Sequence, residues 1–388
     1  VLPSSIMLAG PGMLLNTFLT SLYVKGAVEV NHEAPTWAVA ALLSAILSAT
    51  DPVAVVAALG GLGAPEKLSA VVDGESLLND GSAVVVTYVA RDWVMGANAP
   101  ASEKYCPTSP PTVGCICLFL LQVAGGGTLI GIFAGLILYY WVGLIHSEHS
   151  YVLETTSVLI VVYATFFSAE AAETSGVLAT VTLGIMVSCM VKNQLSHAGA
   201  HGHHMVMHQL CYMCNHIIFF VAGVITVRFM WRATGCAHDF RSPRAWAELA
   251  GLYVALHVSR ALMIALFSPF LRRMGYGINL KEFVILTYSG LRGAVALIMG
   301  LLILQNDYIE PAVKQMIAFH ISGIVFLTLF VNGLTVDNLY RWLDMYPASP
   351  YKATYMRKIY SKIEGKCQEQ SVKPMMRDWF FSDLHFEK

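Results

Sequence analysis

Long apolar runs recur along most of the chain and set the limits on its fold. A helix needs about 20 mostly apolar residues to cross a bilayer. Stretches of about this kind lie near residues 1–23, 37–59, 69–96, 112–142, 151–168, 173–192, 208–230, 246–270, 282–304 and 313–335. Only 13% of the residues are charged, whereas soluble domains carry about 25%. The sequence therefore predicts an all-α, polytopic membrane protein.

The chain changes character after residue 335. The stretch 336–388 is rich in lysine and arginine and holds no apolar run long enough to span a membrane. Because basic loops favour the cytoplasmic side, we expect a transmembrane domain over 1–335 and the start of a cytoplasmic tail over 336–388. The chain opens inside an apolar run, so we expect it to be a piece of something longer at both ends. The net charge of −1 gives no indication of nucleic-acid binding.

Two neighbouring apolar segments carry carboxylates, which are costly at bilayer depth and therefore usually functional. The first segment contains A-T-D-P, Ala49 to Pro52, and the second contains G-E-S-L-L-N-D-G, Gly74 to Gly81. Pro52 has no backbone N–H, so we expect the first helix to break near Thr50. Many transporters hold a small cation with a broken helix beside a buried carboxylate. This stretch therefore predicts an ion site.

A second polar group of residues lies in the ninth apolar segment. There the sequence reads T-Y-S-G-L-R-G-A-V-A-L, with Arg292 between Gly290 and Gly293. An unpaired guanidinium at this depth is very costly, so it needs a carboxylate or freed backbone carbonyls. Both a structural ion pair and direct contact with the ion fit the sequence. A helix broken early and one interrupted by glycine late are typical of an inverted repeat, with the site at their crossing.

A histidine-rich stretch, H-A-G-A-H-G-H-H from His197 to His204, precedes the seventh segment. Such tracts can bind metal, and histidine can also sense pH. No cysteine or carboxylate lies beside it at ligand spacing, so we expect a solvated cytoplasmic loop. Cys211 and Cys214 form a C-x-x-C pair in the apolar segment that follows, where we expect them to be buried like small hydrophobic side chains.

Enzyme motifs are missing from the sequence: it holds no Walker loop, no nucleophile elbow and no zinc helix. We therefore expect neither an enzyme activity nor a cofactor. Glu154, Glu170 and Glu173 lie near segment ends, where we expect them at the interface. A role for Glu170 in the ion pathway stays open.

Four motifs together resemble the monovalent cation/proton antiporter family. They read S-A-T-D-P-V-A-V-V, G-E-S-L-L-N-D-G, A-E-x-x-x-x-S-G-V-L-A and G-L-R-G-A-V-A-L. Three further stretches are similar to its plant salt-overly-sensitive-type plasma-membrane branch: A-G-P-G-M-L-L, S-P-F-L-R-R-M-G-Y-G and S-G-I-V-F-L-T-L-F-V-N-G. The resemblance runs from about Val1 to Arg341.

The resemblance implies an inverted-repeat fold with broken crossing helices, a mobile core domain and a dimerisation domain, with the N-terminal helices missing from this chain. It also implies a homodimer in the plasma membrane that exports Na⁺ in exchange for H⁺. Members of this branch carry a long cytoplasmic regulatory region, so a regulatory kinase is an expected partner. The alternatives are K⁺/H⁺ or mixed Na⁺/K⁺ exchange, and a membrane sensor that does not transport.

Several residues match the ion site of the family. Asp80 matches the ion-binding aspartate, and Ser76 lies one helical turn before it on the same face. The backbone carbonyl of Thr50 and the side chain of Asp51 match further oxygen ligands, which suit a hard cation such as Na⁺. Asn79 matches the neutral partner of the aspartate, which implies electroneutral one-for-one exchange.

The resemblance also implies an ion pair and a competition between the two ions. Glu75 matches the carboxylate that pairs with an arginine, and we expect its partner to be Arg292. Burial favours the protonated form of Asp80, whereas a bound cation favours its carboxylate, so H⁺ and Na⁺ compete for one site. The seventh segment departs from the branch at His216 and Arg228.

Overall fold

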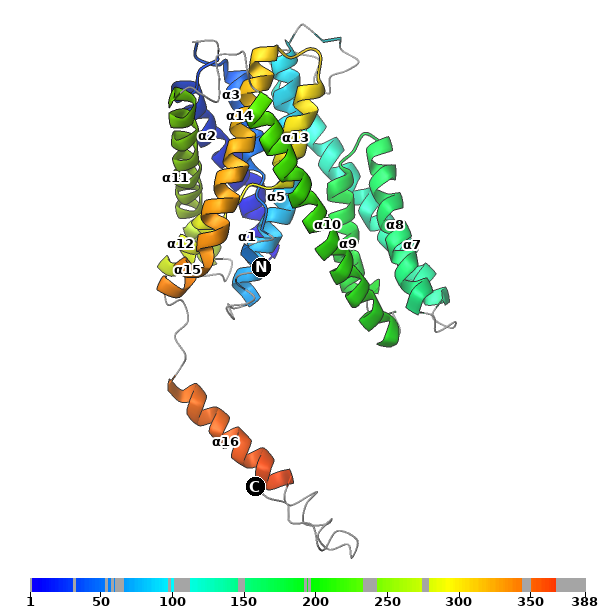
Figure 1. The fold of residues 1–388 in the computed structure, drawn as a ribbon. Helices are drawn as coiled ribbons and strands as arrows, with labels where there is room; N and C mark the ends of the chain where they lie inside the picture. Colours follow the sequence, from blue (N-terminus) through cyan, green and yellow to red (C-terminus); the bar gives the residue numbers. More distant parts are fainter. Residues whose placement is uncertain are drawn as a thin grey trace, which may run out of the picture. The chain divides into compact units, whose positions relative to one another are not determined.

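We describe the protein from a computed structural model. It describes residues 2–30, 33–52, 55–56, 59, 66–96, 99–100, 112–145, 151–191, 194, 197–232, 243–273, 279–343 and 350–367. Regular structure in these residues is helical, apart from one isolated β-bridge between Val30 and Glu33 (Figure 1). The chain divides into two units, Val1–Tyr340 and Arg341–Lys388.

The described helices follow one another along the chain. The first eight are α1 (Leu2–Met7), α2 (Met13–Ala27), α3 (Trp37–Ser48), α5 (Glu66–Met95), α6 (Val113–Leu120), α7 (Gly126–Ile145), α8 (Tyr151–Ala171) and α9 (Gly176–Cys189). The others are α10 (His197–Arg232), α11 (Pro243–Arg273), α12 (Leu280–Tyr288), α13 (Ala294–Gln305), α14 (Pro311–Leu327), α15 (Leu334–Leu343) and α16 (Pro350–Cys367). Short π-helical turns at Leu8–Gly12, Leu121–Gly125 and Thr328–Gly333 join α1 to α2, α6 to α7 and α14 to α15.

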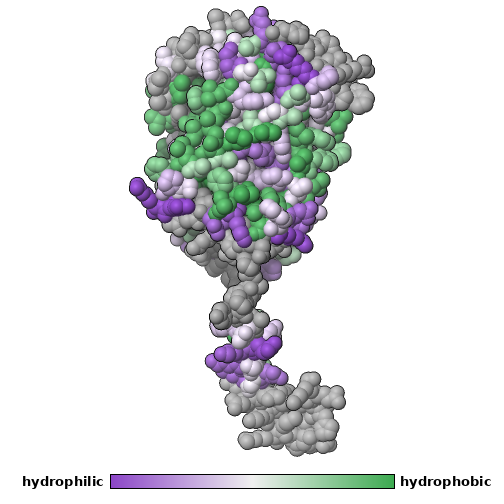
Figure 2. All heavy atoms as spheres, turned by 90° about the vertical axis from the view of Figure 1, so that its left-hand side faces the viewer, coloured by the Kyte–Doolittle hydropathy of each residue, from purple (hydrophilic) through white to green (hydrophobic). Residues whose placement is uncertain are grey.

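By length and composition, six helices in the described part of the chain are able to cross a membrane. They cover Pro3–Ala27, Gly114–Ile145, Val152–Ala171, Gly199–Arg228, Pro243–Arg273 and Pro311–Leu343. The apolar helices α3, α9 and α13 are shorter. Figure 2 shows apolar side chains across the middle of one face of the molecule and hydrophilic ones toward its ends. Exposed apolar residues of this kind suit contact with lipid.

The helices of the first unit pack as two groups with α10 between them. One group holds α2, α3, α5, α11, α13 and α14, which share a large apolar core, and the other holds α7, α8 and α9 (Figure 1). The glycines of α7 let it approach α9 closely. A Cβ at Gly127 would lie 2.8 Å from the Ser175 carbonyl oxygen, and one at Gly135 would lie 2.7 Å from the Cβ of Met186. α10 packs against α8 on one side and against α13 and α14 on the other.

The predicted loop over His197–His204 is wrong, because these residues form the first turns of α10. Between His197 and Arg232 the sequence holds no proline that would stop a helix, and Ala200 and Met207 pack into the apolar cluster of α7, α8 and α9. Tertiary packing therefore outweighs the glycine-rich composition. The expected burial of the C-x-x-C pair is also wrong, since both of its cysteines are exposed and free.

The second unit contains α16, a helix with a different character from those before it. Its described side chains are mostly exposed, and lysine and arginine recur along it at Arg357, Lys358, Lys362 and Lys366. The boundary expected after residue 335, and the cytoplasmic place of this tail, stay predictions.

Candidate ion-binding site

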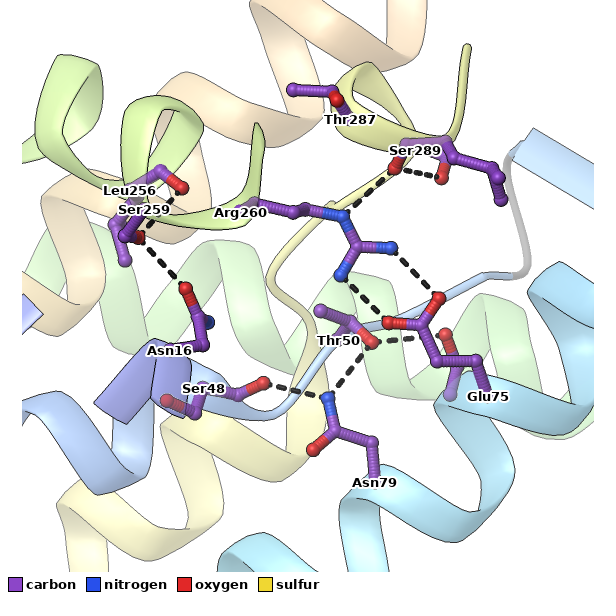
Figure 3. Close-up of polar contacts among 12 residues, drawn as sticks. Asn16, Ser48, Thr50, Glu75, Asn79, Leu256, Ser259, Arg260, Thr287 and Ser289 are labelled. Carbon is purple, nitrogen blue, oxygen red and sulfur yellow. Dashed lines mark hydrogen bonds and ion pairs between the residues drawn. The ribbon is translucent and has the colours of Figure 1, made fainter. Parts of the chain in front are cut away.

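The first broken helix stops where proline removes a hydrogen-bond donor. In a continuous helix the N–H of residue 52 would bond the carbonyl of Ser48, but Pro52 has no N–H. α3 ends at Ser48, as predicted for this region, and the next four residues are not helical. The freed Ser48 carbonyl accepts a hydrogen bond from Nδ2 of Asn79 on α5 at 2.8 Å (Figure 3). An amide side chain thus replaces the missing backbone donor.

A second break, between α12 and α13, meets the first. The backbone N–H of Asp51 donates to the carbonyl of Leu291 at 2.9 Å, so the two non-helical segments are joined directly. A Cβ at Gly293 would overlap the Asp51 carboxylate, and one at Gly290 would lie 2.7 Å from Cδ of Arg260. Each glycine is therefore needed for close approach by a charged side chain, and the predicted interruption by glycine has a packing cause.

A cavity of about 260 Å³ lies beside this crossing. Its lining includes the predicted ion residues Thr50, Asp51 and Asp80, which come from the first break and from α5. Asp73, two turns before Asp80 on the same helix, also lines it, together with Asn215 of α10. The three aspartates and Thr50 thus line a space large enough for a cation and water.

The other two predicted ion residues lie behind the cavity wall. The hydroxyls of Ser76 and Thr50 are hydrogen-bonded at 2.9 Å, and Nδ2 of Asn79 also donates to the Thr50 hydroxyl at 3.3 Å. All three side chains are buried. Neither Ser76 nor Asn79 is among the residues that line the cavity. In this arrangement Ser76 and Asn79 hold the loop that carries Thr50 and Asp51.

Glu75 pairs with a different arginine from the one predicted. Its carboxylate accepts from Nη1 and Nη2 of Arg260 on α11 at 2.9 and 3.0 Å, while Nε of Arg260 donates to the Leu286 carbonyl at 2.8 Å (Figure 3). Both charged side chains are at most 3% exposed. The expected Glu75–Arg292 pair is therefore corrected to Glu75–Arg260. This forked geometry is the strong form of a carboxylate–guanidinium pair.

Sequence reasoning missed Arg260, although it carries the same signal as Arg292. It lies in A-L-H-V-S-R-A-L-M, in the middle of an apolar segment. Arg292 itself is 1% exposed, and its Nε and Nη1 have no hydrogen-bond partner among the described residues. Its backbone N–H donates to the hydroxyl of Thr328 at 3.1 Å. Arg292 is thus a buried side chain next to the site with unused hydrogen-bonding capacity.

The late motif S-G-I-V-F-L-T-L-F-V-N-G supports the second break. Besides Thr328, it supplies Asn332, which is fully buried and whose Nδ2 donates to the backbone carbonyl of Tyr288 at 3.1 Å. Tyr253 donates to Oδ1 of Asn332 at 2.5 Å, and Nε2 of His257 lies 2.8 Å from its Nδ2. The carbonyl at the end of α12 and the amide of Arg292 are thus satisfied by the π-helical turn of another helix.

The glutamates that we expected at the membrane interface differ from one another in their surroundings. Glu154 is buried in the first turn of α8. Glu170 is exposed, and its Oε1 accepts from the N–H of Gly176 at 2.9 Å, which fixes the turn between α8 and α9. Glu170 does not line the cavity at the crossing.

Replacing Gly293 with alanine is expected to disrupt the crossing. The added Cβ overlaps the Asp51 carboxylate, so we expect exchange to fall severalfold and stability to drop by about 1–3 kcal/mol. Vesicle flux and thermal melting in detergent measure the two effects. Gly223→Ala is the control, because no heavy atom lies within 4 Å of the position of its added Cβ. Wild-type exchange by Gly293→Ala would contradict the close contact.

The comparison with known families gives a match over most of the chain. The family described as "Sodium/hydrogen exchanger, transmembrane" matches residues 1–342. The chain belongs to the sodium/hydrogen exchanger family. This confirms the resemblance recognised from the motifs, and it places the chain in a family of transporters rather than enzymes.

Similar proteins include two plant exchangers and a bacterial antiporter. Sodium/hydrogen exchanger 7 of Arabidopsis thaliana is 36% identical over 88% of this chain and 28% of its own length. Sodium/hydrogen exchanger 8 of the same plant is 34% identical over 92% of this chain and 45% of its own length. The Na(+)/H(+) antiporter NhaH of Halobacillus dabanensis is 26% identical over 85% of this chain and 75% of its own. The chain spans less than half the length of either plant relative.

A solved structure confirms the fold. The sodium proton antiporter MjNhaP1 from Methanocaldococcus jannaschii superposes with a TM-score of 0.64, covering 88% of this chain and 79% of that one. The sequence identity is 17%, so the likeness concerns the fold. The predicted all-α polytopic fold of the cation/proton antiporters is therefore confirmed for this chain.

Proposed function

We propose that this protein exchanges Na⁺ for H⁺ across a membrane. The observation that carries the proposal is the pair of carboxylates, Asp51 and Asp80, in one cavity where two broken helices cross. Na⁺ is a hard cation that prefers oxygen ligands, and these side chains and Thr50 supply oxygens. Carboxylates at membrane depth beside broken helices are typical of secondary transporters.

In this mechanism Asp80 carries either a proton or a Na⁺ ion. Burial disfavours the bare carboxylate, so without a cation the side chain binds a proton, and a bound cation displaces it. The backbone N–H of Asp51 is hydrogen-bonded to the Leu291 carbonyl, and its side chain adds a second carboxylate to the lining of the cavity. Because one group serves both ions, the two are transported in opposite directions rather than together.

Asn79 supports one-for-one, electroneutral exchange. Its amide donates to Ser48 and Thr50, so the side chain acts as a neutral hydrogen-bond donor rather than as a proton carrier. With Asp80 as the group that exchanges ions, one proton leaves for each Na⁺ that binds, and the cycle moves no net charge.

The replacement Asn79→Asp is expected to make exchange sensitive to membrane potential. A carboxyl group can donate to the Ser48 carbonyl only when it is protonated, so the change adds a titrating group beside Asp80. Flux into vesicles with and without a potassium–valinomycin potential measures the effect, and the wild type in the same vesicles is the reference. An active variant whose flux ignores the potential would contradict the electroneutral mechanism.

Further features of the proposal rest on the family. We place the protein in the plasma membrane as a homodimer that exports Na⁺ and serves salt and pH homeostasis. A regulatory kinase would act through sequence beyond the part described. K⁺/H⁺ or mixed exchange is the second candidate, because the same oxygen ligands suit K⁺.

A vesicle assay tests the proposed exchange. The purified protein is reconstituted with a pH-sensitive dye inside, and Na⁺ or K⁺ is added outside. We expect Na⁺ to drive proton release, with a smaller response to K⁺. A larger response to K⁺ would favour the second candidate, and no response to either cation would indicate a sensor that does not transport.

A further inference from the structure

His257 of α11 belongs to a hydrogen-bond network that the proposed exchange does not use. Its Nδ1 lies 2.9 Å from the carbonyl oxygen of Tyr253, one turn earlier on the helix, and its Nε2 lies 2.8 Å from Nδ2 of Asn332. Asn332 lies in the π-helical turn Thr328–Gly333 and also donates to the carbonyl of Tyr288 at the end of α12. The network therefore joins three elements next to the second break.

Two backbone carbonyls decide where the hydrogens of this network lie. A carbonyl oxygen only accepts, so the Tyr253 carbonyl requires a hydrogen on Nδ1 of His257. The Tyr288 carbonyl likewise requires the nitrogen of the Asn332 amide to face it, while the amide oxygen accepts from the Tyr253 hydroxyl. The second N–H of Asn332 then points at Nε2 of His257, which accepts it. The form of the imidazole that fits is neutral, with its hydrogen on Nδ1.

A second proton on His257 has no place in this arrangement. It would be bound to Nε2 and would face an N–H of Asn332, so two donors would oppose each other. Rotating the Asn332 amide by half a turn relieves the conflict, because its oxygen then accepts from Nε2. The same rotation points that oxygen at the Tyr288 carbonyl, which loses its donor. Asn332 is fully buried, so the lost hydrogen bond is costly.

The charged groups around His257 do not compensate a positive charge on its ring. Arg260 lies three residues further along α11 and Arg292 lies in the second break, and both act on His257 as positive charges. The titratable side chains beside it are Tyr253 and Tyr288, whose ring centroids lie 4.5 and 6.0 Å from that of the imidazole. In the described part of the chain, no carboxylate forms an ion pair with His257.

We propose that His257 is a positioning residue for exchange: the neutral imidazole holds Asn332 in the orientation that supports the second break, and protonation withdraws this support. The break includes Gly293, which lies against the Asp51 carboxylate and lines the ion cavity. Loss of the bond to Tyr288 therefore loosens one wall of that cavity. Exchange should fall as the water that reaches the partly exposed His257 becomes acidic. This effect rests on the proposed function, whereas the effect of protonation on the network does not.

The pH profile of Na⁺ uptake tests the role of His257. In His257→Gln, the amide oxygen can accept from Asn332 but takes up no proton. Tracer Na⁺ uptake into vesicles, with saturating Na⁺ and equal pH on both sides, is measured from about pH 8 to about pH 5, where histidine usually changes its charge. We expect the loss of uptake over this range to be severalfold larger in the wild type than in His257→Gln. Equal losses in the two proteins would overturn the proposal.

The matched control is His216→Gln. His216 makes the same local contacts on α10, because its Nδ1 lies 2.7 Å from the Tyr212 carbonyl oxygen and the two ring centroids lie 4.1 Å apart. Its side chain is exposed, unlike that of His257. Its replacement should leave the pH profile of the wild type unchanged. A profile that both replacements flatten equally would overturn the specific role of His257.

Thermal melting in detergent at the two ends of this pH range tests the network without transport. We expect acid to lower the melting temperature of the wild type more than that of His257→Gln. An equal decrease in both would overturn the effect of protonation, and a difference in melting with identical uptake profiles would overturn the effect on exchange. A wild type that melts as expected but does not transport would contradict the proposed function and still support the network. If His257→Gln fails to fold, His257→Met, which is also neutral, takes its place in both measurements.

Discussion

Asp80→Asn is expected to reduce Na⁺-driven proton flux to the level of empty vesicles while the protein stays folded. An asparagine cannot take up and release a proton, and it offers a cation a neutral oxygen instead of a charge. Asp80 lies in the cavity at the crossing of the two breaks. Because the change removes the burial of a charge, we expect the melting temperature in detergent to stay the same or to rise.

The control for this variant is Asp307→Asn. Asp307 is exposed in the turn between α13 and α14 and does not line the cavity, so its replacement should leave flux unchanged. Loss of flux in both variants would point to a general effect of lost charge. Coupled Na⁺ and proton flux by a well-folded Asp80→Asn protein would show that another group exchanges the ions, and Asp51 and Asp73 also line the cavity.

The pair of Glu75 and Arg260 is expected to be strongly coupled. Removing one partner of a buried ion pair costs about 3–5 kcal/mol, because the other charge is left buried and unpaired. Glu75→Gln and Arg260→Gln should therefore each lower the melting temperature sharply. The double variant should lose clearly less than the sum of the two losses, because two hydrogen bonds and the ion pair join the two side chains directly.

The matched control is a second double-mutant cycle, in which Arg292→Gln replaces Arg260→Gln. Arg292 is equally buried but makes no ion pair with Glu75 within 4 Å among the described residues. Its coupling to Glu75 should be weaker than that of Arg260. Additive losses for Glu75 and Arg260, together with coupling of Glu75 to Arg292, would restore the pairing expected from the sequence.

The breaks could be predicted from the sequence because their causes are covalent and local. Pro52 lacks a backbone N–H donor in any fold. A glycine has no Cβ, so it allows close approach by any neighbouring group. The partner of Glu75 could not be predicted in this way. Arg260 and Arg292 both lie in apolar segments, and only the packing of α11 against α12 decides which guanidinium reaches the carboxylate.

The start of α10 shows a second limit of sequence reasoning. Glycine, alanine and histidine between residues 197 and 204 have no strong periodic pattern. A prediction from apolar residues alone therefore starts the segment at residue 208. The helix starts earlier because Ala200 and Met207 find apolar neighbours on α7, α8 and α9. The neighbours on α7 and α8 lie far away in the sequence, so a local window does not contain them.

The hydrogen bond between Asp51 and Leu291 bears on how the protein is made. Its two residues are roughly 240 positions apart, so Asp51 leaves the ribosome long before its partner exists. Until α12 and α13 enter the membrane, the N–H of Asp51 needs water or another acceptor, because an unsatisfied polar group costs several kcal/mol in lipid. Chains cut before α13 can therefore insert their earlier helices but cannot complete the ion site. The crossing of the two breaks, and the cavity beside it, is therefore completed late in synthesis.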